Sequence, residues 1–289
     1  MKAMSKPRRP LVSGRPVPKV RPSRTATPRI ELICVGAELL RGRVPERNGS
    51  ELAAQLTDRG GRVARVTVVP DDAVVIAQAL REALDRHAQL VVLTGGLGTA
   101  PDDVTLEAVG ETLGLPLARN HEAQEWVEAG YAEWLRQRRV SSAGLTRTRE
   151  KLFLLPVGTT PLRNPLGLTP GVVCRLAGGP AVVCLPGAPA EARALLQAAG
   201  PLLRELGLKA EVARREIETP TADESALHSL LDRLTEEFPD LWITTRPEQA
   251  RSGAPIVITL EATAASKDAA DTAVDVAVRR LLALASGSP

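Results

Sequence analysis

The sequence predicts an α/β protein with a parallel sheet, followed by a smaller α+β unit. Three observations support this prediction. Apolar strand-like runs alternate with helical patterns from residue 30 onward, which is typical of a parallel sheet with right-handed crossovers. Two of these runs end in glycine turns that lead directly into helices. Beyond a break near residues 200–207 the order of elements changes, and it indicates a module of about 80 residues with a modest core.

The first half of the larger unit contains three expected strand–helix pairs. The apolar residues 30–36 predict a buried strand, and the helix after it begins at Asn48 and ends at Gly60-Gly61. The other expected elements are a strand over 63–69, a helix opened by Asp71 and Asp72, a strand over 90–93, and a helix through Leu113.

The second half begins with a longer helix over 121–139 that carries Trp126, Tyr131 and Trp134. Trp126 and Trp134 lie on one helical face, and we assign this spacing to core or subunit contact rather than to ligand stacking. The aromatic helix therefore favours a homo-oligomer. The elements expected after it are a strand over 152–155, a hairpin of 172–176 and 181–185, and a helix over 190–199.

We expect three segments: a tail over 1–29, a domain over 30–206 and a small α+β domain over 207–289. The tail holds nine Lys or Arg residues and no acid, and its Pro- and Ser-rich composition predicts disorder. A tether to nucleic acid or to an acidic surface, a disordered extension and an early start codon all stay open for it. The small domain is expected to have strands over 212–217, 241–244 and 256–260, and helices over 225–234 and 269–285.

The composition excludes several classes of protein. No apolar run approaches the roughly 20 residues of a membrane span, and no signal-peptide pattern begins the chain, so a cytoplasmic protein is expected. Cys34, Cys174 and Cys184 form no CxxC pair and are expected to be buried, reduced thiols. Outside the tail, 28 basic residues face 34 acidic ones, so nucleic-acid binding is not expected of the folded part.

The segment Leu90–Thr105 is the most informative part of the sequence. An apolar run ends in Thr94-Gly95-Gly96-Leu97-Gly98, and Asp102 and Asp103 open the next helical pattern. Glycine adopts positive φ and lets backbone N–H groups approach an anion closely. The nearby carboxylates suit a metal ion, or hydrogen-bond donors of the same ligand. We expect a site for a phosphate-bearing heterocycle here.

A second glycine turn, over residues 185–189, follows another strand-like run and precedes a helix. Such turns gather at the carboxyl ends of parallel strands, so a shared crevice is expected. A dinucleotide-binding GxGxxG motif is excluded because Pro101 replaces its third glycine, and neither a GxxxxGK[ST] nor a GxSxG motif is present. The chemistry is therefore expected to rest on carboxylates and backbone.

The candidate carboxylates all follow strand ends and are expected to lie at one edge of the sheet; they are Glu38, Asp71, Asp72, Asp102 and Asp103. Asp72 and Asp103 are also good helix N-caps, a role that stabilises by roughly 1 kcal/mol and needs no further function. Acids near a bound phosphate indicate Mg²⁺ or a similar hard cation. Such a site would suit attack of water on a pyrophosphate, with one carboxylate as the base.

Taken together, several motifs of the sequence resemble those of a known family. GAELLRG with Asn48 downstream, VVPDD, TGGLGTAPDDVT, NPLGLTPG and LPGAPAE resemble, in order and spacing, the molybdopterin-binding (MoaB/MogA-like) domain. More narrowly, residues 30–206 are similar to the N-terminal part of the competence/damage-inducible CinA family. The rest resembles the small domain that follows in that family, and nothing matches its C-terminal deamidase domain. The resemblance implies a three-layer α/β/α fold with a mostly parallel sheet, and it also favours a homo-oligomer.

The resemblance further implies a pterin or a phosphorylated nucleotide as ligand. It implies either metal-dependent hydrolysis of ADP-ribose, with Mg²⁺, Mn²⁺ or Co²⁺, or molybdopterin binding in molybdenum cofactor synthesis; a non-catalytic binding module is the third alternative. Asp103, Asp102 and Glu38 are then the catalytic candidates, with Asp102 and Asp103 also holding metal. The expected ligand contacts are Thr94, Gly95, Gly96, Gly98, Asp72, Asn48, Gly167, Pro186 and Gly187.

Overall fold

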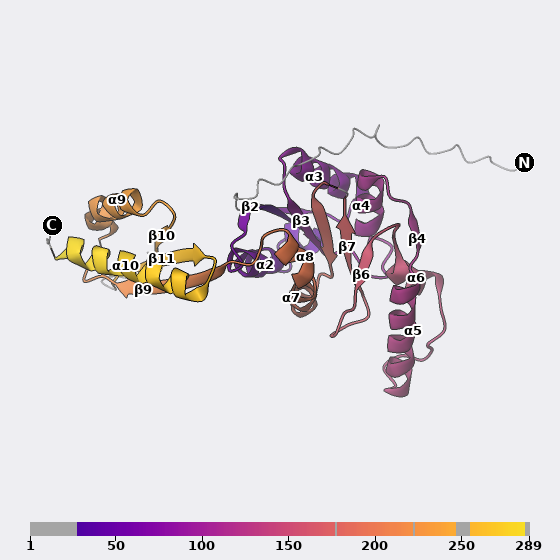
Figure 1. Cartoon of the computed structure of the whole chain (residues 1–289). Helices are drawn as coiled ribbons and strands as arrows, with labels where there is room; N and C mark the ends of the chain where they lie inside the picture. The colour runs from indigo at the N-terminus through magenta and orange to yellow at the C-terminus, as the bar shows by residue number, and fades with distance from the viewer. Residues whose placement is uncertain (1–27, 177, 222, 247–254, 287–289) are drawn as a thin grey trace, which may run out of the picture. The chain divides into compact units, whose positions relative to one another are not determined.

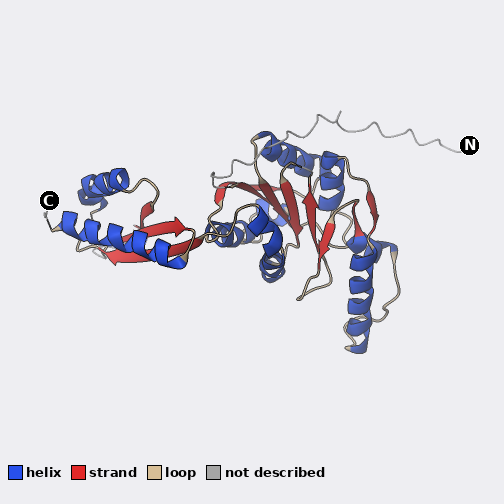
Figure 2. Ribbon diagram, viewed as in Figure 1, coloured by secondary structure: helices blue, strands red, loops and turns tan. Residues whose placement is uncertain are grey.

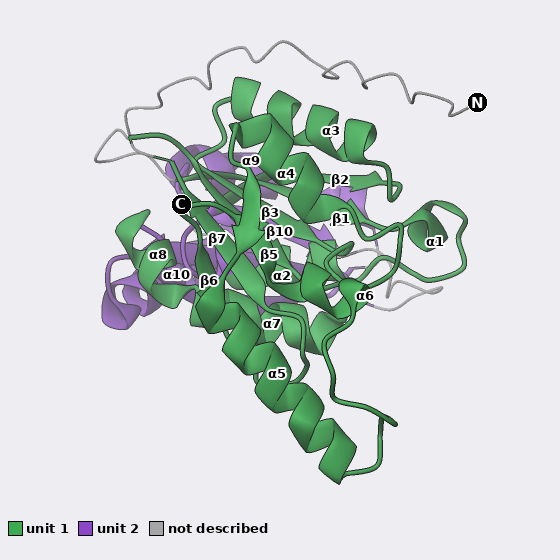
Figure 3. Ribbon diagram, turned by 90° about the vertical axis from the view of Figure 1, so that its right-hand side faces the viewer, with its two compact units in different colours: residues 1–55, 62–206 green, residues 56–61, 207–289 purple. Residues whose placement is uncertain are grey.

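The computed structural model describes residues 28–176, 178–221, 223–246 and 255–286 (Figure 1). The chain divides into two compact units, one of residues 1–55 and 62–206 and one of residues 56–61 and 207–289 (Figure 3). Most of the predicted tail, residues 1–27, lies outside the described residues. Within the described ranges, none of the helices combines the length and apolarity that a membrane crossing requires.

A six-stranded sheet forms the middle of the first unit, with the strand order β2-β1-β3-β8-β7-β6 (Figure 2). The first four strands are parallel, and β7 and β6 extend the sheet in antiparallel fashion. The strands are β1 Arg29–Val35, β2 Arg62–Val69, β3 Leu90–Thr94, β6 Thr160–Leu162, β7 Gly171–Arg175 and β8 Ala181–Leu185. A separate antiparallel pair joins β4 Leu117–Arg119 to β5 Leu154–Pro156.

Helices cover both faces of this sheet, with α3 and α4 on one side and α2, α7 and α8 on the other (Figure 1). The helices are α1 Ala37–Leu40, α2 Asn48–Thr57, α3 Ala73–Asp85, α4 Thr105–Leu113, α5 His121–Arg136, α6 Arg147–Glu150, α7 Pro189–Ala198 and α8 Gly200–Glu205, with a 3-10 helix η1 over Lys151–Phe153. The predicted three-layer fold with a mostly parallel sheet is confirmed.

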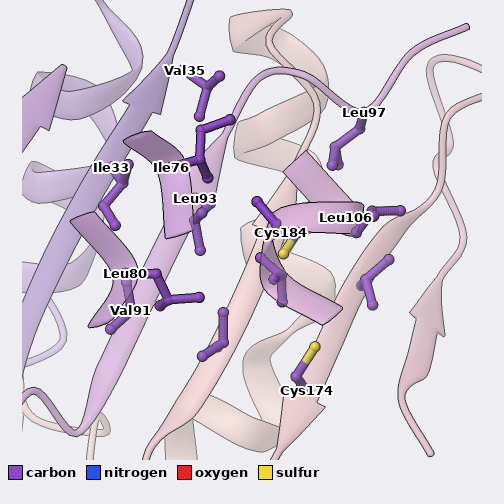
Figure 4. Close-up of a cluster of buried hydrophobic side chains, with 14 of the residues drawn as sticks. Ile33, Val35, Ile76, Leu80, Val91, Leu93, Leu97, Leu106, Cys174 and Cys184 are labelled. Carbon is purple, nitrogen blue, oxygen red and sulfur yellow. The ribbon is translucent and has the colours of Figure 1, made fainter. Parts of the chain in front are cut away.

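The core on the α3 and α4 side is built from small and medium aliphatic side chains (Figure 4). Ile33 and Leu93 project from neighbouring strands toward Ile76 and Leu80 of α3, and all four are at most 1% exposed. Strands β3 and β8 are buried along their whole length, which is typical of a parallel sheet covered on both faces. A rigid sheet therefore supports the loops at its carboxyl edge.

The second unit is an antiparallel sheet of order β10-β11-β9 with α9 and α10 packed on it. Its elements are β9 Glu211–Glu218, η2 Glu224–Leu227, α9 His228–Glu237, β10 Trp242–Arg246, β11 Val257–Ala264 and α10 Lys267–Ala285. Ser266 caps α10 by accepting a hydrogen bond from Ala269 N–H, so the helix begins before the predicted residue 269. The predicted α+β character is confirmed.

The division into two units falls between residues 206 and 207, within the break predicted near residues 200–207, and helix α8 precedes it with Pro201 in its first turn, where the missing N–H costs no helical hydrogen bond. One local expectation is wrong. The helix predicted over 121–139 ends at Arg136, and Arg138 takes the left-handed conformation with φ 58°. On this helix Ala123 and Val127 are the buried residues, while Trp126 and Trp134 are half-buried.

Candidate functional site

The two glycine turns lie side by side at the carboxyl edge of the sheet. Strands β3 and β8 are parallel neighbours in which Thr94 pairs with Leu185, and Gly95 N–H donates to the Leu185 carbonyl at 3.0 Å. A Cβ atom on Gly187 would lie 3.5 Å from the Gly95 Cα, and one on Gly95 would lie 2.2 Å from the Val35 carbonyl oxygen. The close approach of three strand ends explains why glycine is needed at Gly95.

In the glycine loop the carbonyls of Gly95 and Gly96 accept hydrogen bonds from Thr105, whereas the N–H groups that follow Gly95 stay free. Gly95 and Gly96 have φ of 98° and 66°, which glycine adopts without strain. The Thr105 hydroxyl donates to the Gly95 carbonyl at 2.9 Å, and Thr105 N–H donates to the Gly96 carbonyl at 3.1 Å. In the described part of the chain, the N–H groups of Gly96, Leu97 and Gly98 have no acceptor. The Leu97 side chain is buried in the core, so this arrangement is anchored.

A cavity of about 410 Å³ opens in front of this loop. Its lining joins the ends of β1, β3 and β8, and none of the described residues that form it is Lys or Arg. The lining residues are Val35, Glu38, Asp71, Gly95, Gly96, Leu97, Gly98, Asp102, Asp103, Thr169, Pro186, Gly187, Ala188 and Glu191. The site therefore combines uncapped N–H donors with a wall of carboxylates.

Asp102 and Asp103 take different positions in this wall. The Asp103 carboxylate accepts a hydrogen bond from Ala100 N–H at 2.7 Å, and a Cβ atom on Gly98 would lie 2.6 Å from its Oδ2. Asp103 thus closes the 100–103 turn instead of capping α4, whose N-cap residue is Val104. Asp102 is exposed and makes no hydrogen bond within the described residues. Its carboxylate is free for a ligand or a cation.

Asp71 and Asp72 are adjacent in the sequence, but their carboxylates take different positions in the structure. Asp72 caps α3, because its Oδ1 accepts from Val74 N–H at 2.9 Å and from Val75 N–H at 3.1 Å. Asp71 lines the cavity, and its Oδ2 accepts from Ala37 N–H at 2.7 Å at the start of α1. The structure therefore places Asp71 in the cavity wall and gives Asp72, predicted as a ligand contact, a capping position.

Asn48 and Thr94 lie behind the cavity wall and tie the loops together. Asn48 Nδ2 donates to the Thr94 hydroxyl and to the Gly187 carbonyl, both at 2.8 Å. Thr94 in turn donates to the Pro186 carbonyl at 2.9 Å. These contacts fix the β8–α7 turn against the end of β3, so Asn48 supports the site from behind its lining.

Glu191 is a cavity residue that sequence reasoning missed. It lies in the first turn of α7, and its Oε2 accepts from Asn164 Nδ2 at 2.6 Å. A Cβ atom on Gly167, a predicted ligand contact, would lie 2.6 Å from the same oxygen, so Gly167 borders the Glu191 carboxylate outside the cavity lining. The signal for Glu191 was its position four residues after Gly187 in the second glycine turn.

The carboxylates form no ready-made metal cage: in the described ranges, no group of three or more His, Cys, Asp or Glu side chains is arranged to hold a metal ion. One oxygen each of Asp71, Asp103 and Glu191 is already engaged by an N–H donor. Mg²⁺ usually takes only one or two carboxylates and completes its shell with water and phosphate oxygens. The described carboxylates therefore do not by themselves provide a complete set of ligands for a metal ion.

The cysteines do not contribute a nucleophile. All three are free and buried, as the sequence predicts. Burial, with the Glu46 carboxylate nearby, raises the pKa of Cys34 to about 12, so the thiol stays protonated at neutral pH. The neighbouring Cys174 thiol and burial raise the pKa of Cys184 as well.

Comparison with known proteins gives one family and several relatives. The family described as "probable molybdopterin binding domain" matches residues 31–205. A protein of Pyrobaculum aerophilum is 36% identical over 255 residues, which cover 88% of this chain and 92% of that protein. A protein of Aeropyrum pernix is 37% identical over 80% of this chain and 83% of its own length. The structure of CinA from Thermoplasma acidophilum, described as of unknown function, is 34% identical with a TM-score of 0.56, covering 61% of this chain and 98% of that one.

Proposed function

This chain belongs to the probable molybdopterin-binding domain family, and from that premise we propose that its glycine loop binds the phosphate of a pterin or nucleotide. The observation that carries the proposal is the set of N–H groups of Gly96, Leu97 and Gly98, which have no acceptor in the described chain and border the cavity. Backbone N–H groups in a glycine turn form a favourable concave site for anions.

The charge of the cavity wall indicates that the ligand needs a cation. Five carboxylates line the cavity, and no Lys or Arg among the described lining residues offsets them. A phosphate placed there alone would be repelled by these acids. We propose that Asp102 and Asp103, with Glu38 as a further candidate, would hold a divalent cation such as Mg²⁺, Mn²⁺ or Co²⁺ that comes with the ligand.

The reaction that suits this arrangement best is hydrolysis of the pyrophosphate in an ADP-ribose-like nucleotide. The divalent cation would supply charge neutralisation on the phosphate oxygens. The loop N–H groups would hold one phosphoryl group and stabilise the charge that develops on it. Glu38, which is not engaged by an N–H donor in the described chain, would accept the proton of the attacking water.

A second candidate is a pterin-binding protein of molybdenum cofactor synthesis. The specific observation in its favour is the carboxylate of Glu191 in the cavity wall, which has one oxygen, Oε1, without a partner in the described residues. Pterins present adjacent N–H donors, and ionised carboxylates are acceptors only, so the acidic wall suits such a head group. The small-molecule ligand is shared by both candidates, and the reaction distinguishes them.

The test measures binding and turnover separately on the full chain. Isothermal titration with ADP-ribose, with and without Mg²⁺, Mn²⁺ or Co²⁺, is expected to show binding that depends on the cation. AMP is then measured in the same mixtures. Cation-dependent binding together with AMP release supports the hydrolase. Retention of a pterin through purification, with no AMP under any condition, supports the second candidate. Absence of binding to nucleotides, pyrophosphate and pterins alike contradicts the proposed function.

A further inference from the structure

Lys151 reaches from η1 to the turn that follows the glycine loop. Its Nζ donates hydrogen bonds to the Ala100 carbonyl at 2.8 Å and to the Asp103 carbonyl at 2.7 Å, 51 and 48 positions away in sequence. The adjoining residues Leu152 and Phe153 are 3% and 0% exposed, so the backbone that carries Lys151 is fixed in the core. Lys151 therefore links η1, which is held in the core, to the exposed turn of residues 100–103.

The same turn is also closed from within. Asp103 N–H donates to the Ala100 carbonyl at 3.1 Å, and the Asp103 carboxylate accepts from Ala100 N–H at 2.7 Å. The Ala100 carbonyl thus accepts from both Asp103 and Lys151. The Asp103 carboxylate lies against Gly98, whose N–H is one of the free donors of the loop. A shift of the turn would move the anion site.

Lys151 also brings positive charge close to the glycine loop. It lines a smaller cavity of about 20 Å³, and Gly96, Gly98 and Asp103 line this cavity as well as the large one. Lys151 is the Lys or Arg residue among the described residues that line the smaller cavity, whereas the described lining of the large cavity contains neither. An ammonium group has three donors, and the carbonyls of Ala100 and Asp103 use two.

We propose that Lys151 is a positioning residue of the anion site. Its ammonium group fixes the 100–103 turn and thereby the directions of the Gly98 N–H and the Asp103 carboxylate. This inference rests on the proposed function, because it assumes that the loop holds a ligand phosphate. Donors that are already oriented bind an anion without the cost of ordering them, so a loosened turn weakens binding.

The experiment compares Lys151→Met and Lys151→Arg with Lys267→Met. Lys267 is a matched control, because its Nζ also donates to a backbone carbonyl, that of Val212 at 2.9 Å, but within the second unit. Hydrogen exchange by mass spectrometry reports the free protein, and titration with Mg²⁺–pyrophosphate reports binding. Thermal melts check folding, and Lys151→Gln, which keeps one amide donor group, replaces the Met variant if that variant does not fold.

In Lys151→Met we expect faster exchange of the amides over residues 96–104 and binding at least about tenfold weaker, equal to about 1.4 kcal/mol. Lys151→Arg should stay within about threefold of the wild type, because the guanidinium keeps donors for both carbonyls. Lys267→Met should change neither quantity.

Unchanged exchange and unchanged binding in Lys151→Met overturn the inference while the proposed function stands. Weaker binding with unchanged exchange overturns the positioning role, since it means that the ammonium acts on the ligand directly. If the wild type binds no Mg²⁺–pyrophosphate, ADP-ribose or pterin, the proposed function fails and the inference fails with it, an outcome that the wild-type titration alone identifies.

Discussion

The side-chain amide of Asn48 donates a hydrogen bond to the Thr94 hydroxyl at 2.8 Å. This contact joins the start of α2 to the end of β3, and the second hydrogen of the same amide goes to the Gly187 carbonyl. One side chain therefore links both glycine turns to a third element of the domain.

Replacing Asn48 should cost stability as well as binding. Asn48→Ala leaves the Gly187 carbonyl without this donor, and we expect a loss of about 1–3 kcal/mol in the free energy of unfolding. Asn48→Asp should be worse, because it places a carboxylate beside that carbonyl. Urea denaturation measures both variants. Ser50→Ala, which removes only an exposed hydroxyl bonded to the Arg47 carbonyl, is the control. Equal stability of all three variants would contradict the linking role of Asn48.

Gly96 and Gly114 provide a matched test of crowding in the glycine loop. Their φ values are 66° and 69°, but a Cβ atom on Gly96 would lie 2.3 Å from the Thr105 hydroxyl, and one on Gly114 would meet nothing within 4 Å. Gly114→Ala should therefore cost about 1 kcal/mol, from backbone strain alone. Gly96→Ala should cost at least about 1 kcal/mol more and also weaken Mg²⁺–pyrophosphate binding. Equal melting temperatures for the two variants would contradict this prediction, because they would mean that the loop can relax to accept a Cβ atom at position 96.

Asp103 combines a structural hydrogen bond with a charge, and two substitutions separate them. Asp103→Asn keeps an oxygen acceptor for Ala100 N–H, so the turn should hold while cation-dependent binding falls by about tenfold, or about 1.4 kcal/mol. Asp103→Ala should lose the binding and also speed amide exchange in the turn. Asp85→Asn, an exposed charge change at the end of α3, is the control. Binding of full strength in Asp103→Ala would remove Asp103 from the site.

The carboxyl group of Glu31 should make the free energy of unfolding depend on pH. Burial raises the pKa of its carboxyl, but the hydrogen bonds and charges of Arg86 and Arg29 outweigh burial and hold the pKa below the ordinary value. A lowered pKa in the folded state means that this contribution is complete above the ordinary glutamate pKa of about 4.3 and is lost as pH falls through the folded value. The free energy of unfolding should therefore fall below about pH 4.3.

Glu31→Gln tests this prediction. At pH 7 the variant should lose free energy of unfolding, by an amount near the lower end of about 3–5 kcal/mol because Arg86 remains 28% exposed. Its free energy of unfolding should also change less between pH 5 and pH 3 than that of the wild type. Glu82→Gln removes the half-exposed second partner of Arg86 and should change little. Parallel pH profiles for the wild type and Glu31→Gln would contradict this account. Chemical denaturation at each pH provides the data.

The fold was predictable because its signals are local. Continuous apolar runs such as that of β3 and the glycines that end them lie within a few residues of each other, and they indicate a strand, a turn and the next helix without knowledge of distant partners. The short strand β4 was not predicted, since its three residues form a strand only through pairing with β5. Local propensity contains no such information.

The candidate site was predictable only in part for the same reason. Asp71 and Asp72 are adjacent and chemically identical, and what separates them is a hydrogen bond from Ala37, 34 positions earlier. Lys151 reaches the loop across about 50 positions, and no sequence pattern connects the two. Positions whose role depends on a distant partner need the folded structure to be recognised.

The hydrogen bond from Thr94 to the Pro186 carbonyl joins strands that are neighbours in space but 92 positions apart in the chain. The chain segment between the two strands must form a closed loop before β8 can pair with β3, and contacts between residues so far apart in sequence form slowly. A nascent or truncated chain that stops before Pro186 can hold the first glycine turn but lacks its companion. During refolding, the ability to bind ligand should therefore appear late, once β8 has paired with β3.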